Sequence, residues 1–158
     1  GYEPLDIVSL PVPGNFYCAV VHPHIVVRTK AAREILPKAV PMHDAVRQWG
    51  NVGGLVAGLC TGNIKLIGHS MQDFVAEPYR KQFIPGFDHL REKILETGAL
   101  AMNISGSGPS VFALCDSRPV AESAGKVLKE HFEALDTGCE VYVVKVSNKG
   151  AKLTHLTL

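Results

Sequence analysis

Apolar residues along the chain follow two patterns, which predict strands and helices in turn. Short apolar runs rich in β-branched residues predict four strands, at residues 16–21, 99–104, 110–115 and 139–146. After the first and third runs, apolar residues recur at three- and four-residue steps, which is the spacing of amphipathic helices. The predicted order is therefore strand, helices, strand, strand, helix, strand.

This order is the split βαβ pattern of a ferredoxin-like α+β sandwich with extra helices in the first crossover. We expect a four-stranded antiparallel sheet with helices on one face. No repeat, low-complexity segment or internal linker interrupts the chain, so residues 1–158 are expected to form a single domain. Within it, residues 1–14 are expected to be an incoming connection, and residues 148–158 a short tail strand at most.

Five helices are expected in this order, and their starts are marked by cap residues or prolines. These markers are Thr29, Pro41, Asn63, Pro85 and Pro119. Pro37 and Pro78 are expected to end the first and third helices. Trp49 lies on the apolar stripe of the second helix and is expected in the core. Leu95 and Leu135 are expected to face inward from the last two helices.

The second helix contains three glycines on one face, Gly50, Gly54 and Gly58. Each costs about 1 kcal/mol relative to Ala in a helix interior. Close approach of a neighbouring element is expected to offset this cost. The same glycines mark the place where an apolar face toward an absent partner is expected.

Composition excludes several classes of protein. With 158 residues, 46% hydrophobic and 20% charged, the chain is neither disordered nor fibrous. A formal charge of +1 provides no field that would hold nucleic acid. The longest uncharged run, residues 48–64, is too polar for a membrane span, and the amino terminus lacks the features of a signal peptide. We expect a cytoplasmic chain, or one whose start has been cut away.

Cysteines and histidines show no metal-binding pattern. The four cysteines lie far apart without a CxxC pair, and are expected to be reduced thiols packed as small hydrophobic residues. His22 and His24 could place two imidazoles on one side of an extended segment, but no third ligand lies nearby in sequence. No metal ligand is therefore assigned.

The strongest local signal is the run Ser105-Gly106-Ser107-Gly108 between two predicted strands. Two glycines separated by one residue permit positive φ angles, and consecutive N–H groups can then face one phosphate or carboxylate. The run is not a Walker A loop, because no Lys follows it. A tight strand connection made of ordinary turn residues explains the same sequence, so both interpretations stay open.

Two further segments offer charged groups. Thr29 and Arg33 are four residues apart, so they share one face of the first helix and could bind a carboxylate. An N-cap with a solvated arginine is the alternative. Glu77 and Arg80 flank Pro78, where a solvated helix end would give the same pattern.

Together these segments closely resemble the carboxyl-terminal half of the homoserine kinase family, which belongs to the GHMP small-molecule kinases. The resemblance rests on residues 76–80 (AEPYR), 84–87 (IPGF), 104–114 and 28–33, and extends from about residue 15 to the end. The glycine loop resembles the third motif shared by all GHMP kinases. The EPYR and IPGF stretches narrow the resemblance to homoserine kinases.

The resemblance implies transfer of the γ-phosphoryl group of MgATP to the hydroxyl of L-homoserine, giving O-phosphohomoserine on the route to threonine. By similarity, four residues bind the amino-acid substrate: Thr29, Arg33, Arg80 and Gly106. The two arginines would face its α-carboxylate. Ser105, Gly106, Ser107 and Gly108 match the loop near the phosphate. The resemblance implies no catalytic base and no metal ligand in this half.

The chain departs from the family in lacking its first motif and its P-x-x-x-G-L-G-S-S-A-A-like phosphate loop. We therefore expect ATP and Mg²⁺ to be bound mainly by a missing amino-terminal half, and the chain alone to show negligible turnover. The expected partners are L-homoserine, ATP and that amino-terminal domain. Whole enzymes of the family are commonly dimers, so a homodimer stays open.

Two alternatives stay open from the sequence. One is a freestanding ferredoxin-like module that binds an amino acid for regulation, since such domains often bind small ligands without catalysis. The other is the carboxyl-terminal half of a different GHMP kinase, such as a mevalonate or galactose kinase.

Overall fold

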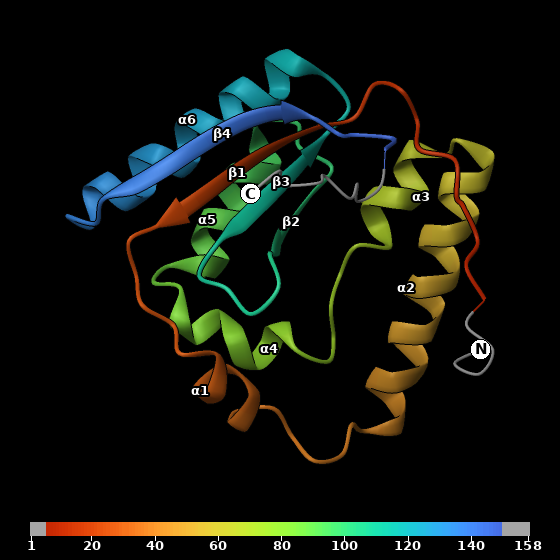
Figure 1. Cartoon of the computed structure of the whole chain (residues 1–158), viewed down its shortest axis with the longest axis horizontal. Helices are drawn as coiled ribbons and strands as arrows, with labels where there is room; N and C mark the ends of the chain where they lie inside the picture. The colour runs from red at the N-terminus through yellow and green to blue at the C-terminus, as the bar shows by residue number, and fades with distance from the viewer. Residues whose placement is uncertain (1–5, 150–158) are drawn as a thin grey trace, which may run out of the picture.

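The computed structural model describes residues 6–149, and its elements follow the predicted order (Figure 1). The strands are β1 (Tyr17–Pro23), β2 (Ala101–Ile104), β3 (Val111–Cys115) and β4 (Cys139–Lys145). The helices are α1 (Thr29–Glu34), α2 (Met42–Thr61), α3 (Ile64–His69), α4 (Glu77–Arg80), a 3₁₀ turn (Lys81–Phe83), α5 (Phe87–Glu96) and α6 (Arg118–Ala134). The expected tail strand falls mainly on residues 150–158, outside the described residues.

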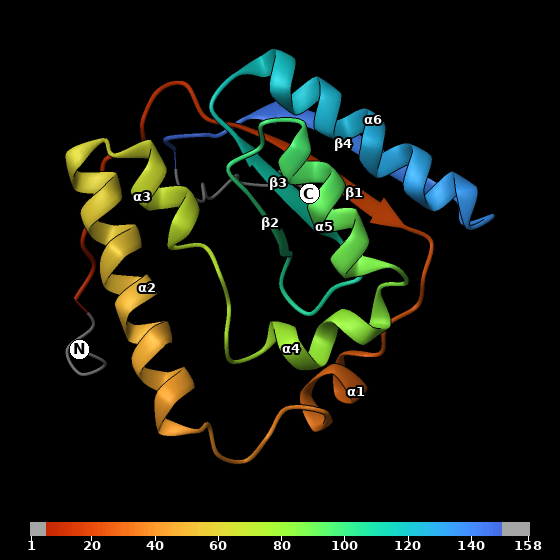
Figure 2. The same cartoon turned by 180° about the vertical axis from the view of Figure 1, so that it is seen from behind.

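The four strands form one antiparallel sheet in the order β2-β3-β1-β4, which is the ferredoxin-like arrangement predicted from the sequence. β1 is central and pairs with β3 and β4. Its Val21 lies opposite Val111 on one side and Val141 on the other. Helices α5 and α6 cover one face of the sheet (Figures 1 and 2).

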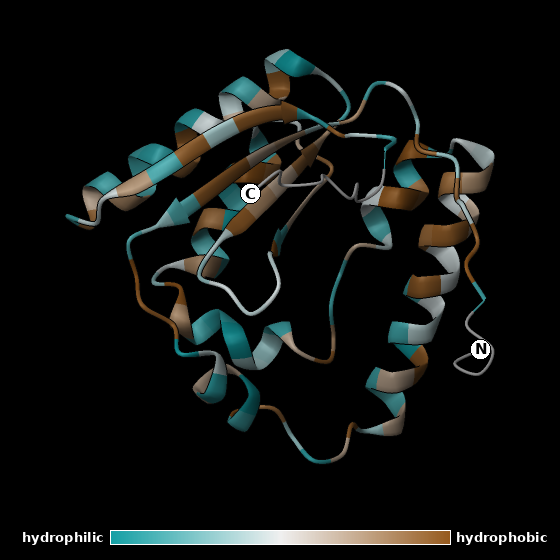
Figure 3. Cartoon of the chain, in the orientation of Figure 1, coloured by the Kyte–Doolittle hydropathy of each residue, from teal (hydrophilic) through white to brown (hydrophobic). Residues whose placement is uncertain are grey.

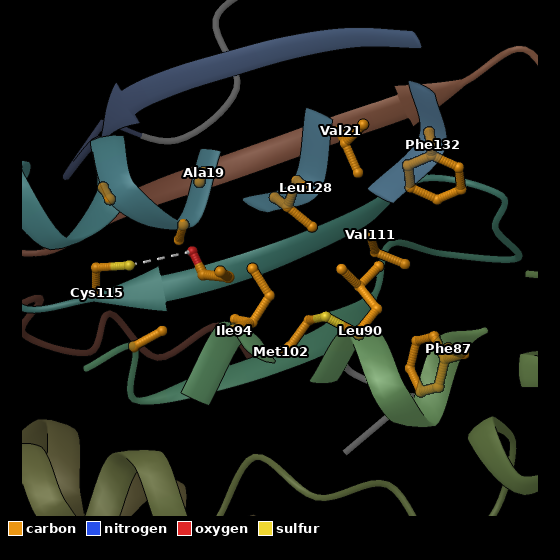
Figure 4. Close-up of a cluster of buried hydrophobic side chains, with 14 of the residues drawn as sticks. Ala19, Val21, Phe87, Leu90, Ile94, Met102, Val111, Cys115, Leu128 and Phe132 are labelled. Carbon is orange, nitrogen blue, oxygen red and sulfur yellow. Dashed lines mark hydrogen bonds between the residues drawn. The ribbon is translucent and has the colours of Figure 1, made fainter. Parts of the chain in front are cut away.

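The main core lies between this face and the two helices (Figure 4). Because successive residues of a strand point to opposite faces, alternate positions of β1 and β3 enter the core. The buried residues from strands and helices are Ala19, Val21, Val111, Ala113, Leu90, Ile94, Leu128 and Phe132.

A second, smaller cluster lies on the opposite face at one end of the sheet. It centres on Phe16, Ile67 and Leu114, and Leu55 and Leu59 of α2 pack against it. Through this cluster α3 and the carboxyl end of α2 attach to the sheet, while the rest of α2 extends away from it (Figures 1 and 2). The expectation of helices on one face therefore holds for α5 and α6, whereas α3 and the carboxyl end of α2 pack on the opposite face.

The third helix is shorter than predicted. α3 is capped by Asn63, as expected, because the Asn63 side chain accepts a hydrogen bond from the N–H of Leu66, but the helix ends at His69 rather than before Pro78. The carboxylate of Asp73 accepts hydrogen bonds from the N–H groups of residues 75, 76 and 77 and so starts a new helix, α4. Pro78 occupies the first turn of α4, where a missing N–H costs nothing.

Four other local predictions are wrong. Trp49 is 64% exposed, and Leu95 and Leu135 are also exposed. Helical spacing identifies an apolar stripe, but not whether another element covers all of it. The residue before α1 is Arg28, so Thr29 is the first helical residue and makes no capping hydrogen bond.

The glycine face of α2 approaches α3 closely at two of its three positions. A Cβ on Gly58 would lie 2.8 Å from Ile67 Cγ1, and one on Gly54 would meet the side chain of Ser70. Nothing lies within 4 Å of the corresponding position on Gly50. Close approach therefore explains Gly54 and Gly58, but leaves Gly50 without a contact.

Within residues 6–149, no helix has the length and apolar character needed to cross a membrane. All four cysteines are free thiols. Cys115 is buried in the core as expected, and burial, with smaller contributions from Cys18 and Asp116, raises the pKa of its thiol to about 12. Cys60 is exposed, which corrects the expectation that all four pack as hydrophobic residues.

Candidate substrate site

The first site residues lie on α1, a six-residue helix that follows β1 after a short extended connection. Ala32 is fully buried and fixes the helix against the rest of the molecule. Thr29 and Arg33 lie on the exposed side of α1. The hydroxyl of Thr29 and the guanidinium of Arg33 have no hydrogen bond or ion pair with any other part of residues 6–149, so both are available to a ligand.

Arg80 joins α1 to the glycine loop. Its Nε donates a hydrogen bond of 3.2 Å to the carbonyl oxygen of Ala32, the residue before Arg33. Its Nη1 donates one of 3.0 Å to the carbonyl oxygen of Gly106. The half-buried guanidinium therefore holds the α1 backbone and the loop at a fixed separation, while its second terminal nitrogen donates no hydrogen bond to the described residues.

Helix α4, which carries Arg80, is anchored by a buried ion pair. Arg91 Nη2 donates a hydrogen bond to the carboxylate of Glu77, which is 7% exposed, and another to the carbonyl oxygen of Met102. The Arg91 guanidinium also lies 4.7 Å from the ring centroid of Phe87. Glu77 is therefore a structural anchor, and the interpretation of residues 77–80 as a solvated helix end is wrong.

The glycine loop is a tight connection between β2 and β3. Ser105 N–H donates to the carbonyl of Ser110 at 2.8 Å, and Gly108 N–H donates to the carbonyl of Ser105 at 3.0 Å. Gly106 and Gly108 adopt φ angles of +60° and +79°, which disfavour any residue with a side chain.

This turn leaves two consecutive amides free. The N–H groups of Gly106 and Ser107 donate to no acceptor within residues 6–149. Consecutive unpaired amides in a glycine turn are suited to bind the oxygens of an anion. The loop is thus both a tight strand connection and a candidate anion site, so the two interpretations of its sequence are compatible.

The structure brings the predicted site residues together. In both views α1, α4 and the β2–β3 connection meet at one side of the molecule (Figures 1 and 2). The hydrogen bonds of Arg80 to Ala32 and Gly106 link all three segments. Three segments far apart in the chain therefore present cationic groups and free amides in one region, which suits a small ligand carrying negative charge.

Sequence reasoning missed the residues that support this region. Besides Glu77, Arg91 and Asp73, the His22 Nδ1 and Ser110 Oγ share a hydrogen bond of 2.8 Å and tie the end of the loop to β1. Residues 6–149 contain no group of three or more His, Cys, Asp or Glu side chains arranged to hold a metal ion.

The chain matches a known protein family. The profile of the family described as "GHMP kinases C terminal" matches residues 55–134. A protein named homoserine kinase from Chlorobium phaeovibrioides is 44% identical over 154 residues, which are 96% of this chain and 48% of that protein. One from Chloroherpeton thalassium is 44% identical over 153 residues, again 96% of this chain and 48% of the relative.

A solved structure of a homoserine kinase also matches this chain over about half of its own length. The crystal structure of homoserine kinase from Cytophaga hutchinsonii superimposes with a TM-score of 0.90 at 52% identity, covering 95% of this chain and 48% of that one. The resemblance seen in the sequence is confirmed, and the chain spans about half the length of the relatives it matches.

Proposed function

Because the chain belongs to the GHMP kinase family as its carboxyl-terminal domain, we propose that it is the substrate-binding domain of a homoserine kinase. The complete cytoplasmic enzyme transfers the γ-phosphoryl group of ATP to the hydroxyl of L-homoserine, giving O-phospho-L-homoserine for threonine biosynthesis. Relatives named homoserine kinase that match nearly the whole chain support this proposal. Residues 1–158 form one domain of that enzyme, and an amino-terminal domain is its partner.

In this proposal, Arg33 and Arg80 bind the α-carboxylate of homoserine. Planar guanidinium groups match a carboxylate in charge and geometry, and such charge-assisted hydrogen bonds are strong. Arg33 is supported by its exposure and lack of a partner within residues 6–149. The hydroxyl of Thr29, four residues earlier on the same face of α1, is a hydrogen-bond partner for the substrate's polar groups.

The glycine loop is proposed to close on the substrate next to the phosphate. The free amides of Gly106 and Ser107 support this role, and Ser105 and Gly108 shape the turn that leaves them free. ATP and Mg²⁺ are held mainly by the amino-terminal domain. We assign no catalytic base, because phosphoryl transfer depends chiefly on positioning and charge stabilisation.

The observation that carries the proposal is the double hydrogen bond of Arg80 to Ala32 and Gly106. It supports a carboxylate-binding role for Arg80, because the guanidinium lies between α1, which carries Arg33, and the glycine loop. A zwitterionic substrate that receives a phosphoryl group needs both features within a few ångströms. Neither a regulatory amino-acid module nor a kinase for mevalonate or galactose is favoured by relatives of such high identity.

The test is a substrate panel with the complete protein of which this chain is part. ATP is supplied with L-homoserine, mevalonate, galactose or no acceptor, and ADP release and the phosphorylated product are measured. We expect turnover only with homoserine, and a phosphomonoester on its side-chain oxygen. The isolated chain should stay well below the roughly 1 s⁻¹ typical of slow enzymes.

Three outcomes would contradict the proposal. One is a preference for mevalonate or galactose. Another is rapid ADP release by the isolated chain with homoserine. The third is amino-acid binding by a complete protein that transfers no phosphoryl group, which would instead identify the regulatory module.

A further inference from the structure

Helix α2 carries an exposed apolar stripe. Five large apolar side chains on it are between 39% and 71% exposed, namely Met42, Val46, Trp49, Val52 and Val56. Their spacing of four, three, three and four residues places them on one side of the helix. Brown apolar residues recur along α2 in Figure 3, although the helix extends away from the sheet. Contiguous exposed patches of this kind mark interaction surfaces.

Two glycines of α2, Gly50 and Gly53, make no close contact with the rest of the described chain that would explain their presence. Gly50 and Gly53 have nothing within 4 Å of the position that a Cβ would take, in contrast to Gly54 and Gly58, which face α3. Each glycine in a helix interior costs about 1 kcal/mol relative to Ala. Close approach of another backbone at Gly50 and Gly53 would offset that cost.

The outward direction of the stripe is fixed, because the other side of α2 is tied to the loop 70–76. Phe74 N–H donates to Gln48 Oε1 at 2.9 Å, and the Arg47 guanidinium lies 3.7 Å from the Phe74 ring centroid. Asn51 Nδ2 donates to the carbonyl of Gln72 at 2.8 Å. The helix cannot rotate to bury Trp49 without breaking these contacts.

We propose that this stripe is the docking surface for the amino-terminal domain of the same polypeptide, an inference that rests on the proposed function. The relatives are about twice as long as this chain, and the matched family describes their carboxyl-terminal part, so their remaining half precedes the region matched here. That half needs an apolar surface to pack on, and the stripe is a large one that residues 6–149 leave uncovered.

The path of the chain favours this occupant over a second copy. Val12 packs in the same cluster as Leu55 and Leu59 of α2, and the incoming segment runs beside α2 (Figures 1 and 2). A domain joined through this segment arrives at α2 with a high effective concentration, whereas a second copy must associate from solution. Ile7 and Val8 on this segment are themselves exposed apolar residues.

Trp49 provides a direct test, since it is the only tryptophan of the chain. The chain is labelled with 5-fluorotryptophan and joined to the unlabelled amino-terminal domain by split-intein ligation, so that only Trp49 is observed by fluorine NMR. The shift of this resonance between H₂O and D₂O reports solvent contact. We expect the shift to fall by more than half on ligation, and an unchanged shift would overturn the proposal.

A matched control places the probe on another exposed apolar site. In a Trp49→Phe, Leu135→Trp variant, the label lies at the carboxyl end of α6, far from α2 in both views (Figures 1 and 2). Its solvent shift is expected to be unchanged by ligation. An equal fall at both sites would mean unspecific compaction and would overturn the assignment to α2.

A second measurement covers the case in which ligation perturbs folding. Val46→Ser and Trp49→Ser are expected to leave the unfolding midpoint of the isolated chain unchanged and to lower that of the intact protein. The reverse pattern, or a concentration-dependent dimer of the isolated chain that Trp49→Ser abolishes, would contradict the proposed occupant. None of these readouts uses homoserine or ATP, so failure of the proposed substrate and failure of the docking surface are separate results.

Discussion

Removal of the Glu77 carboxylate is expected to destabilise the chain more than any exposed ion pair can. The Glu77→Ala variant leaves Arg91 with a charge that has lost its partner beside the buried core. Breaking a buried pair by removing one member typically costs 3–5 kcal/mol. Because the Arg91 side chain keeps 26% of its surface exposed, we expect a value near the lower end, about 3 kcal/mol. A domain has only about 5–15 kcal/mol of stability in total.

The assay is urea unfolding followed by far-ultraviolet circular dichroism, with a double-mutant cycle. Arg91→Ala also removes the contacts with Met102 and Phe87, so it is expected to be costly on its own. The double variant should cost at least about 1 kcal/mol less than the sum of the single variants, because both remove the same pair. Glu77→Gln, which keeps the shape but not the charge, should fall between wild type and Glu77→Ala.

The pair Lys81–Asp88 is the matched control. Asp88 is two-thirds exposed, and its carboxylate accepts a hydrogen bond of 2.7 Å from Lys81. Exposed pairs contribute about 0–1 kcal/mol, so Asp88→Ala should cost less than about 1 kcal/mol. An equal effect of Glu77→Ala and Asp88→Ala, or an additive double-mutant cycle, would refute the role of Glu77 as the buried anchor of α4.

Three further outcomes follow from the packing. Gly58→Ala should lower the free energy of unfolding by more than about 1 kcal/mol, since its Cβ would meet Ile67, whereas Gly50→Ala should raise it by up to about 1 kcal/mol in the isolated chain. Equal effects would contradict this. Burial raises the pKa of Cys115 from 9.0 to about 12, so above pH 9 the unfolded chain loses a proton that the folded chain keeps, and stability falls as pH rises. The stability of Cys115→Ala should fall less steeply between pH 9 and 12, and identical slopes would be inconsistent with the shift. Thiol reagents followed by mass spectrometry should label exposed Cys60 first and Cys115 last, and the opposite order would exclude the described burial.

Much of the fold could be predicted because its signals are local. The strand around Ala19 and that around Ala113 are apolar runs bounded by turn residues, and their order along the chain leaves few topologies. The glycine loop could be predicted because two glycines separated by one residue permit positive φ angles, and Gly106 and Gly108 adopt them. Arg33 and Arg80 are predicted through resemblance, and in the structure Arg80 donates a hydrogen bond to Ala32, the residue before Arg33.

The sequence marks the break between α3 and α4 at Asp73 and Pro78. Asp73 followed by Pro78 is a helix start, with an acceptor for free amides and a proline in the first turn. The apolar spacing of Met71 and Phe74 suggested a continuous helix instead, although both residues pack from a loop. Local hydrogen-bond competition therefore outweighed periodicity at this boundary.

Other features could not be predicted from the sequence, because they depend on tertiary contacts. Glu77 and Arg91 are fourteen residues apart, a separation that no helix or strand rule connects. The exposure of Trp49 depends on what covers α2, which periodicity does not report. The sequence pattern thus predicts which faces are apolar, whereas the buried pair and the uncovered stripe appear only in the folded chain.

The most direct test of the central claim is the KM for L-homoserine of the complete enzyme with Arg33→Ala. The exposed Arg33 guanidinium makes no hydrogen bond or ion pair within residues 6–149, so its removal should leave the fold and the KM for ATP unchanged. Loss of a hydrogen bond to a charged group costs about 1.5–3 kcal/mol, which predicts a roughly 10- to 150-fold rise in the KM for homoserine. An unchanged KM for homoserine, or an equal rise for ATP, would contradict the assignment of this region as the homoserine site.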